Sequence, residues 1–190
     1  EELTFEGQRT PSYLEIGMES DKVIGIRTFS KTIAPGLKAG YSISPKGFFD
    51  YYDNLEHGRI MSPSTFNLHI IAEYLQLGNF HEHIKKIRNY YKEKKDCLIS
   101  SLKNELSGFD INWIEPKGGM FAWINLPNKY TKSLFDKFLY YGVLPLPSEG
   151  FEPNKPLKKG LRINFSYPSL KDINEGVIRL RKAFLDVYKK

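Results

Sequence analysis

Apolar and polar positions alternate along the chain with two different periods. From residue 80 to residue 106 the apolar side chains recur at helical spacing among charged ones, which predicts one long amphipathic helix ending near Gly108. Around Arg162 the apolar side chains occupy every second position, which predicts a half-buried strand. Further helices are expected at residues 46–55, 64–75, 133–141 and 170–187, and further strands at residues 111–114, 121–126 and 143–146. The two periods together indicate a chain that contains both helices and strands.

A loop between two short apolar runs carries Lys31. Residues 23–26 and residues 39–43 predict two buried strands on either side of this loop. Pro35 is followed by a glycine, and this pair excludes a continuous helix between the strands. Lys31 is therefore expected in a turn at the end of the first strand.

Hydroxyl groups and a second cation lie close to Lys31 in the sequence. Thr28, Ser30, Thr32 and Lys38, together with free backbone N–H groups, form a donor set that suits a phosphate. A lysine beside a bound phosphate, in a partly desolvated pocket, can lose its proton and attack an aldehyde. These are the requirements for holding pyridoxal 5′-phosphate as a Schiff base.

Residues 28–41 resemble the cofactor-lysine segment of the fold-type I pyridoxal-phosphate enzymes, the aspartate aminotransferase superfamily. The resemblance implies that Lys31 is the Schiff-base lysine, a catalytic residue, and that Thr28 and Ser30 bind the cofactor phosphate. The family has an arginine at the position of Lys38. A lysine there keeps the positive charge for the phosphate but lacks the bidentate guanidinium fork.

Two later segments resemble the same family, in the order expected for it. Residues 116–127 resemble its Gly-Gly-Met-Phe-x-Trp strand, in which paired glycines permit close backbone approach. The second segment is the predicted strand at residues 161–166. There the resemblance implies that Arg162 binds the α-carboxylate of the substrate, for which a planar guanidinium is well suited.

The resemblance covers the C-terminal half of a fold-type I catalytic domain. It implies that residues 1–77 are the remainder of a large cofactor-binding α/β lobe and that residues 78–190 form a small α+β lobe. In family order, the carboxylate for the pyridine nitrogen and the tyrosine for the phenolic oxygen precede residue 1, so we expect this chain to be inactive alone. Residues 62–65 resemble the segment that reaches a neighbouring subunit's cofactor, which implies a homodimer.

Two function classes remain open. The first is an aminotransferase acting on an amino acid and a 2-oxo acid, most similar to the aminoadipate and kynurenine aminotransferases. The second is the effector-sensing, aminotransferase-like domain of a GntR/MocR-type transcriptional regulator, in which DNA binding would belong to a domain preceding residue 1. A domain with similarity of fold only, and no cofactor, is a third possibility.

Composition and charge bear on whether the protein spans a membrane, binds nucleic acid or binds a metal. The chain is 41% hydrophobic and 26% charged, as in ordinary globular proteins, and no apolar stretch approaches the roughly 18 residues that span a bilayer. Its single cysteine, Cys97, favours a reducing, cytoplasmic location. The net charge is +6, but the basic residues of the predicted long helix fit its solvated side better than a nucleic-acid surface. The four histidines lack the spacing of a metal site, and we expect none.

Overall fold

The computed structural model describes residues 2–9, 11–17, 22–48, 50–51, 64–127, 132–151 and 159–188. The chain divides into two compact units, Glu1–Ile87 and Arg88–Lys190, and each is described here by itself. Helix α4 (Phe80–Leu106) contains the boundary between them. The predicted lobes at residues 1–77 and 78–190 refer to a whole catalytic domain and stay a prediction.

The first unit contains an antiparallel strand pair and two helical segments that follow it. Its elements are α1 (Tyr13–Ile16), β1 (Gly25–Thr28), the 3-10 turn η1 (Pro35–Leu37), β2 (Gly40–Ile43), α3 (Thr65–Gln76) and the first two turns of α4. Strands β1 and β2 pair so that Thr28 lies opposite Gly40. Of the helix expected at residues 46–55, residues 46–48 and 50–51 are helical, and the remainder lies outside the described residues.

The two strands of this unit are not buried, contrary to the prediction. Ile26 is 80% exposed, and Tyr41 and Ile43 are each 48% exposed. A two-stranded ladder has two faces, and it needs further strands or packed helices to bury them. The short apolar runs therefore predicted the positions of the strands correctly but not their exposure.

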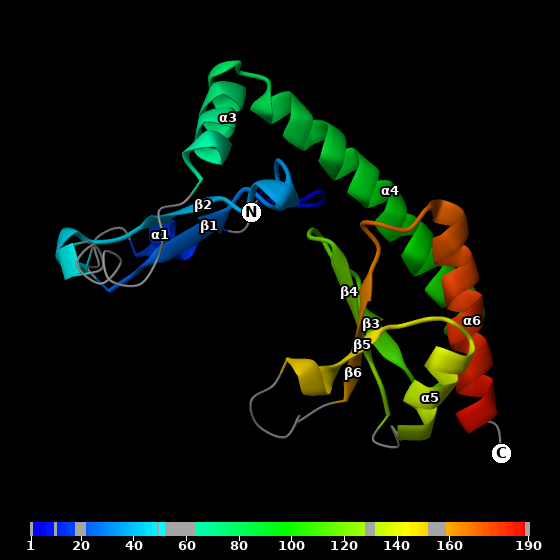
Figure 1. Cartoon of the computed structure of the whole chain (residues 1–190). Coiled ribbons are helices and arrows are strands. Elements are labelled where there is room, and N and C mark those ends of the chain that lie inside the picture. Colours follow the sequence, from blue (N-terminus) through cyan, green and yellow to red (C-terminus); the bar gives the residue numbers. More distant parts are fainter. Residues whose placement is uncertain are drawn as a thin grey trace. The chain divides into compact units, whose positions relative to one another are not determined.

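The second unit is a four-stranded antiparallel sheet with helices on one face (Figure 1). Its elements after α4 are β3 (Asn112–Ile114), β4 (Phe121–Asn125), α5 (Lys132–Tyr140), β5 (Leu146–Pro147), the 3-10 turn η2 (Ser148–Gly150), β6 (Gly160–Asn164) and α6 (Leu170–Tyr188). The strand order is β3-β4-β6-β5. Helices α4, α5 and α6 lie on the same side of the sheet in Figure 1.

The strand expected at residues 143–146 is shorter and begins later than predicted. Gly142 adopts a positive φ of 68°, its N–H donates to the Leu139 carbonyl, and the Val143 N–H donates to the Phe138 carbonyl. This pair of bonds is a Schellman motif, so residues 142 and 143 complete the end of α5. Pro145 follows and has no N–H for a ladder. Strand β5 consequently starts only at Leu146.

The core of the second unit lies between the sheet and its helices. Its members are large apolar side chains with at most 2% of their surface exposed: Leu98, Leu102, Leu106, Ile124, Leu134, Phe138, Leu161, Phe165, Leu180 and Phe184. The alternation predicted around Arg162 is confirmed, because Leu161 and Phe165 are buried in this core. Arg162 projects from the opposite face, in register with Trp123.

Two lysines of α4 contradict the expectation that its charges lie on a solvated side. Lys94 and Lys95 are only 2% and 1% exposed. The Lys94 ammonium donates to the carbonyls of Ser166 (2.9 Å) and Tyr167 (3.2 Å), just after β6. Lys95 forms ion pairs, one of them with Asp96 at 2.6 Å. Burial is tolerated because the ammonium groups have acceptors that replace water.

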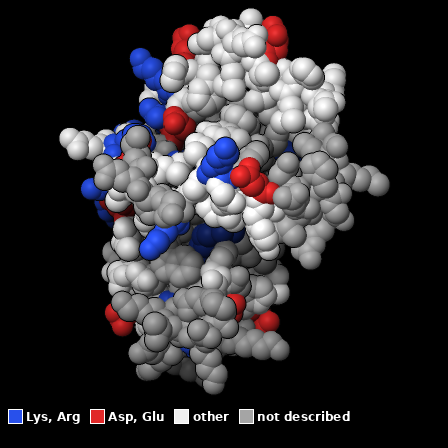
Figure 2. Space-filling view, turned by 90° about the vertical axis from the view of Figure 1, so that its left-hand side faces the viewer, with Lys and Arg blue, Asp and Glu red and all other residues white. Residues whose placement is uncertain are grey.

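The remaining surface charge is mixed. Lys and Arg side chains lie among Asp and Glu side chains on the face that Figure 2 shows, as far as the described residues are concerned. None of the helices formed by the described residues has the length and apolar character required to span a lipid bilayer.

Candidate active site

Lys31 lies in a tight turn directly after β1, as its sequence context predicts. The Phe29 carbonyl accepts from the N–H groups of Thr32 (3.2 Å) and Ile33 (2.8 Å), which closes the turn around Lys31. The Lys31 side chain is exposed. The partly desolvated pocket expected around it is therefore not formed by the described part of the first unit.

Thr28 and Ser30, the two hydroxyl residues predicted to hold a phosphate, are brought together by this turn. Their oxygens are 3.0 Å apart, and the Ser30 N–H donates to the Thr28 oxygen over 3.1 Å. Thr28 is placed by the strand ladder, where it pairs with Gly40. A Cβ atom on Gly40 would lie 2.3 Å from the Arg27 carbonyl oxygen, so only glycine permits this close approach of β1 and β2.

Lys38 lies at the other end of the same loop, between η1 and β2. It adopts a left-handed conformation, with φ 48° and ψ 41°. This conformation costs a residue with a side chain about 1–2 kcal/mol. Such conformations are concentrated at functional sites. Two hydroxyls, backbone N–H groups and a lysine on one loop are chemically suited to the phosphate of pyridoxal phosphate.

Arg162 lies against two aromatic rings in the second unit. Its guanidinium carbon is 4.3 Å from the centroid of the Phe121 ring and 4.3 Å from the centroid of the Phe151 ring. The Trp123 ring meets the Phe151 ring nearly edge-on, with centroids 6.2 Å apart. We call Phe121 and Phe151 the aromatic pair. Cation–π attraction to each ring restricts the orientation of the guanidinium.

The Nε atom of Arg162 is buried and has no hydrogen-bond partner among the residues that the structure describes. A buried donor without an acceptor costs about 1–3 kcal/mol. A carboxylate can accept two parallel hydrogen bonds from a guanidinium, which is the arrangement that arginine favours. The guanidinium of Arg162 is chemically suited to an anionic ligand, and its binding of the substrate carboxylate stays a prediction.

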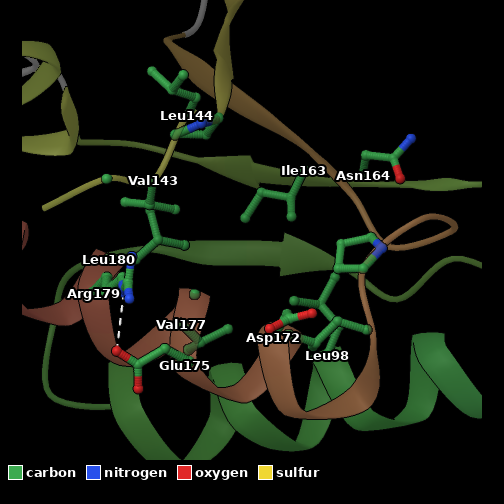
Figure 3. Close-up of a pocket in the computed structure, with 15 residues that line it drawn as sticks. Leu98, Val143, Leu144, Ile163, Asn164, Asp172, Glu175, Val177, Arg179 and Leu180 are labelled. Atoms are coloured by element: carbon green, nitrogen blue, oxygen red, sulfur yellow. Dashed lines mark hydrogen bonds and ion pairs between the residues drawn. The ribbon is translucent and has the colours of Figure 1, made fainter.

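A pocket of about 370 Å³ lies on the other, helix-covered face of the sheet (Figure 3). Its walls are mostly apolar and include Val143 and Ile163. An ion pair between Arg179 and Glu175, 2.9 Å long, lies at its edge. Because neighbouring residues of a strand face opposite sides, Ile163 lines this pocket and Arg162 does not. The pocket is thus separate from the candidate carboxylate site.

The sequence did not reveal the aromatic pair as a unit. Phe121 stands in the quoted glycine-rich motif, but Phe151 is 30 residues further on, at the end of η2. No local spacing connects Phe151 with Arg162, because the contact depends on how the strands are paired. A phenylalanine in a Pro- and Gly-rich loop was the available signal, since such loops often border binding sites. For metals, the described residues contain no group of three or more potential ligands.

Comparison with known proteins identifies the family. The sequence pattern of the family "Aminotransferase class I and II" matches residues 2–180. The chain belongs to this family. This agrees with the resemblance seen in the segments around Lys31, Phe121 and Arg162, and the structure matches part of the fold of fold-type I enzymes.

Relatives include both enzymes and regulators. The chain is 32% identical over 173 residues to aromatic-amino-acid aminotransferase 1 of Thermococcus litoralis, covering 90% of the chain and 41% of that protein. It is 28% identical to the uncharacterized HTH-type transcriptional regulator YdfD of Bacillus subtilis, covering 83% of the chain and 32% of that protein. Among solved structures it resembles LysN, the α-aminoadipate aminotransferase of Thermus thermophilus in complex with N-(5′-phosphopyridoxyl)-L-leucine. For LysN the TM-score is 0.90 and the identity 28%, covering 97% of the chain and 48% of LysN. The chain therefore spans less than half the length of the relatives it matches.

Proposed function

We propose that this chain functions within a pyridoxal-phosphate-dependent aminotransferase, which moves an amino group between an amino acid and a 2-oxo acid. The observation that carries the proposal is Arg162, whose buried Nε has no partner among the described residues and lies beside two aromatic rings. An amino acid and a 2-oxo acid share one group that this side chain can bind, the carboxylate. Membership of the aminotransferase family supports the same reaction.

Each predicted site residue has a role in this reaction. Thr28, Ser30 and Lys38 would hold the phosphate of the cofactor, and Lys31 would bind its aldehyde carbon. Pyridoxal phosphate, when bound, supplies an electron-withdrawing ring that stabilises negative charge on the substrate Cα atom. Arg162 would bind the carboxylate and orient the substrate. The free amine of Lys31 would then take the proton from Cα as a general base.

The complete reaction is proposed for the protein with all the elements of its relatives. Because this chain spans 41% of one relative and 48% of another, and because Lys31 is exposed in the first unit, we expect little turnover from these 190 residues alone. A homodimer and a cytoplasmic location belong to the same proposal. The single cysteine favours a reducing compartment.

An effector-sensing domain of a GntR/MocR-type regulator is the second candidate. The match to the regulator YdfD favours it, since 83% of this chain aligns with that protein. In such a domain Lys31 and Arg162 would bind the cofactor and a carboxylate-bearing effector, and turnover would be weak or absent. Binding without turnover therefore separates the regulator from the enzyme.

Amino transfer to a 2-oxo acid tests the proposal directly. The protein with all the elements of its relatives, for which the reaction is proposed, would be assayed with pyridoxal phosphate, a panel of amino acids and 2-oxoglutarate, and the new 2-oxo acid would be measured. We expect Lys31→Ala to abolish turnover and Arg162→Ala to raise KM for the amino acid. Lys46→Ala and Arg181→Ala remove exposed charges outside the candidate site, and they should leave turnover and KM unchanged. Equal activity of Lys31→Ala and the unmodified protein would refute the proposal.

A further inference from the structure

Two side chains from different helices contact the backbone of the loop that carries Lys31. From α4, the His83 Nε2 lies 2.9 Å from the Thr32 carbonyl oxygen. From α3, the Asn67 side-chain amide donates to the Leu37 carbonyl over 2.9 Å. One contact is at the start of the loop and the other near its end, and all four residues belong to the first unit.

The His83 contact fixes the peptide between Thr32 and Ile33, which begins one residue after Lys31. A carbonyl oxygen can only accept, so the His83 ring donates its Nε2–H to Thr32. The Tyr74 ring packs edge-on against the His83 ring, with centroids 6.1 Å apart and an interplanar angle of 88°. His83 is half-buried, so its ring orientation is restricted by packing as well as by this bond. The orientation of the Lys31 turn is thereby linked to α4.

The Asn67 contact fixes the peptide next to Lys38. The Leu37 carbonyl and the Lys38 N–H belong to the same planar peptide group, so a bond to this carbonyl restricts the orientation of the peptide that precedes Lys38. Lys38 has the left-handed conformation that a residue with a side chain avoids unless its surroundings impose it. Asn67 lies in the first turn of α3, where its backbone N–H donates to the Ser64 hydroxyl.

We propose that His83 and Asn67 are positioning residues, with His83 orienting Lys31 and Asn67 orienting Lys38. The inference rests on the proposed function, in which Lys31 binds the aldehyde of the cofactor and Lys38 its phosphate. The two residues then have separable effects. Loss of His83 impairs covalent bond formation between Lys31 and the aldehyde, whether or not the aldehyde carries a phosphate. Loss of Asn67 impairs only the additional binding that the phosphate group provides.

Amide hydrogen exchange measures how stably the Lys31 loop is held in the protein without cofactor. Removing one hydrogen bond should speed the exchange of the Thr32 and Ile33 amides in His83→Ala about two- to tenfold. His83→Gln keeps an N–H donor at a similar reach and should restore slow exchange. His81→Ala changes an exposed histidine of the same helix and is the matched control. Equal exchange in His83→Ala and His81→Ala would overturn the role of His83 in the loop.

Two aldehydes then separate the two residues. Pyridoxal phosphate and pyridoxal would each be added to the protein and reduced with borohydride, and the product on Lys31 would be quantified by mass spectrometry. We expect His83→Ala to lower labelling by both aldehydes several-fold. Asn67→Ala should lower the ratio of Lys31 labelled by pyridoxal phosphate to Lys31 labelled by pyridoxal. Asn67→Gln should partly restore this ratio. Gln76→Ala, an exposed amide of α3, is the control.

The outcomes distinguish the inference from the proposed function. If the unmodified protein carries no label at Lys31, the proposed function fails, and the exchange experiment still decides whether His83 holds the loop. If Lys31 is labelled equally in all variants, the proposed function stands and the positioning roles are overturned. Loss of labelling with both aldehydes in Asn67→Ala would also overturn the division of roles.

Discussion

Replacing Phe151 by leucine should weaken binding of the substrate carboxylate without removing Arg162. The Phe151 ring centroid is 4.3 Å from the guanidinium carbon, and its edge contact with Trp123 places it on the Arg162 face of the sheet. Leucine keeps an apolar side chain at this position but provides no aromatic face. The guanidinium is then held by only one ring of the aromatic pair, and its orientation is less restricted.

The magnitude follows from the single contact that is lost. A cation–π contact contributes about 0.5–1 kcal/mol when exposed and about 2 kcal/mol when desolvated. Arg162 is half-buried with a buried Nε, so its value lies within this range. If that energy serves to position the guanidinium, KM for the amino acid and for the 2-oxo acid should rise about 2- to 30-fold. The turnover number should change less, because the ring does not touch the reacting atoms.

A double-mutant cycle assigns the effect to Arg162. KM would be measured for the unmodified protein, Phe151→Leu, Arg162→Ala and the combination, with Tyr167→Leu as a control because that ring is 93% exposed. We expect Phe151→Leu to have almost no further effect once Arg162 is alanine. An equal factor in both backgrounds would refute the reasoning, because Phe151 would then act independently of the guanidinium.

Three further predictions concern stability of the second unit and can be measured by urea denaturation. Phe184 is fully buried against Phe109 and Phe138, so Phe184→Ala should cost about 3–5 kcal/mol, and a loss below 1 kcal/mol would contradict this packing. The Ser169 hydroxyl caps α6 by accepting from the Asp172 N–H (3.1 Å), so Ser169→Ala should cost about 0.5–2 kcal/mol, whereas Ser169→Asp should retain most of the stability. Hydrogen bonds from the Ser169 hydroxyl and N–H lower the pKa of Asp172. Its contribution is therefore present above the unfolded carboxyl value and is lost as pH falls through the lower folded value. Below about pH 4 the denaturation midpoint should decline, and Asp172→Asn should reduce this decline.

The sequence predicted those features that depend on neighbours along the chain. The turn at Lys31 followed from apolar runs and a Pro-Gly pair, and the position of Arg162 on the face opposite Leu161 followed from strand alternation. Both appear in the structure. The long helix also begins and ends close to the expected residues, because its periodicity extends over many turns.

Features that depend on distant partners were not predicted. Burial of Lys94 is possible because the carbonyls of Ser166 and Tyr167, more than 70 residues away, accept hydrogen bonds from its ammonium group. Phe151 reaches Arg162 through strand pairing, and the burial of β1 and β2 depends on which other elements pack against them. These properties depend on tertiary arrangement, for which residue periodicity contains no direct signal.

The most direct test of the central claim is whether Lys31 is the residue that binds pyridoxal phosphate. The protein would be incubated with limiting cofactor and reduced with borohydride, and every lysine-containing peptide would be quantified by mass spectrometry. We predict that Lys31 carries most of the label, that Lys38→Ala reduces this label, and that Lys46 is labelled only at background level. Label spread evenly over exposed lysines, and unchanged in total by Lys31→Ala, would contradict a cofactor site at Lys31.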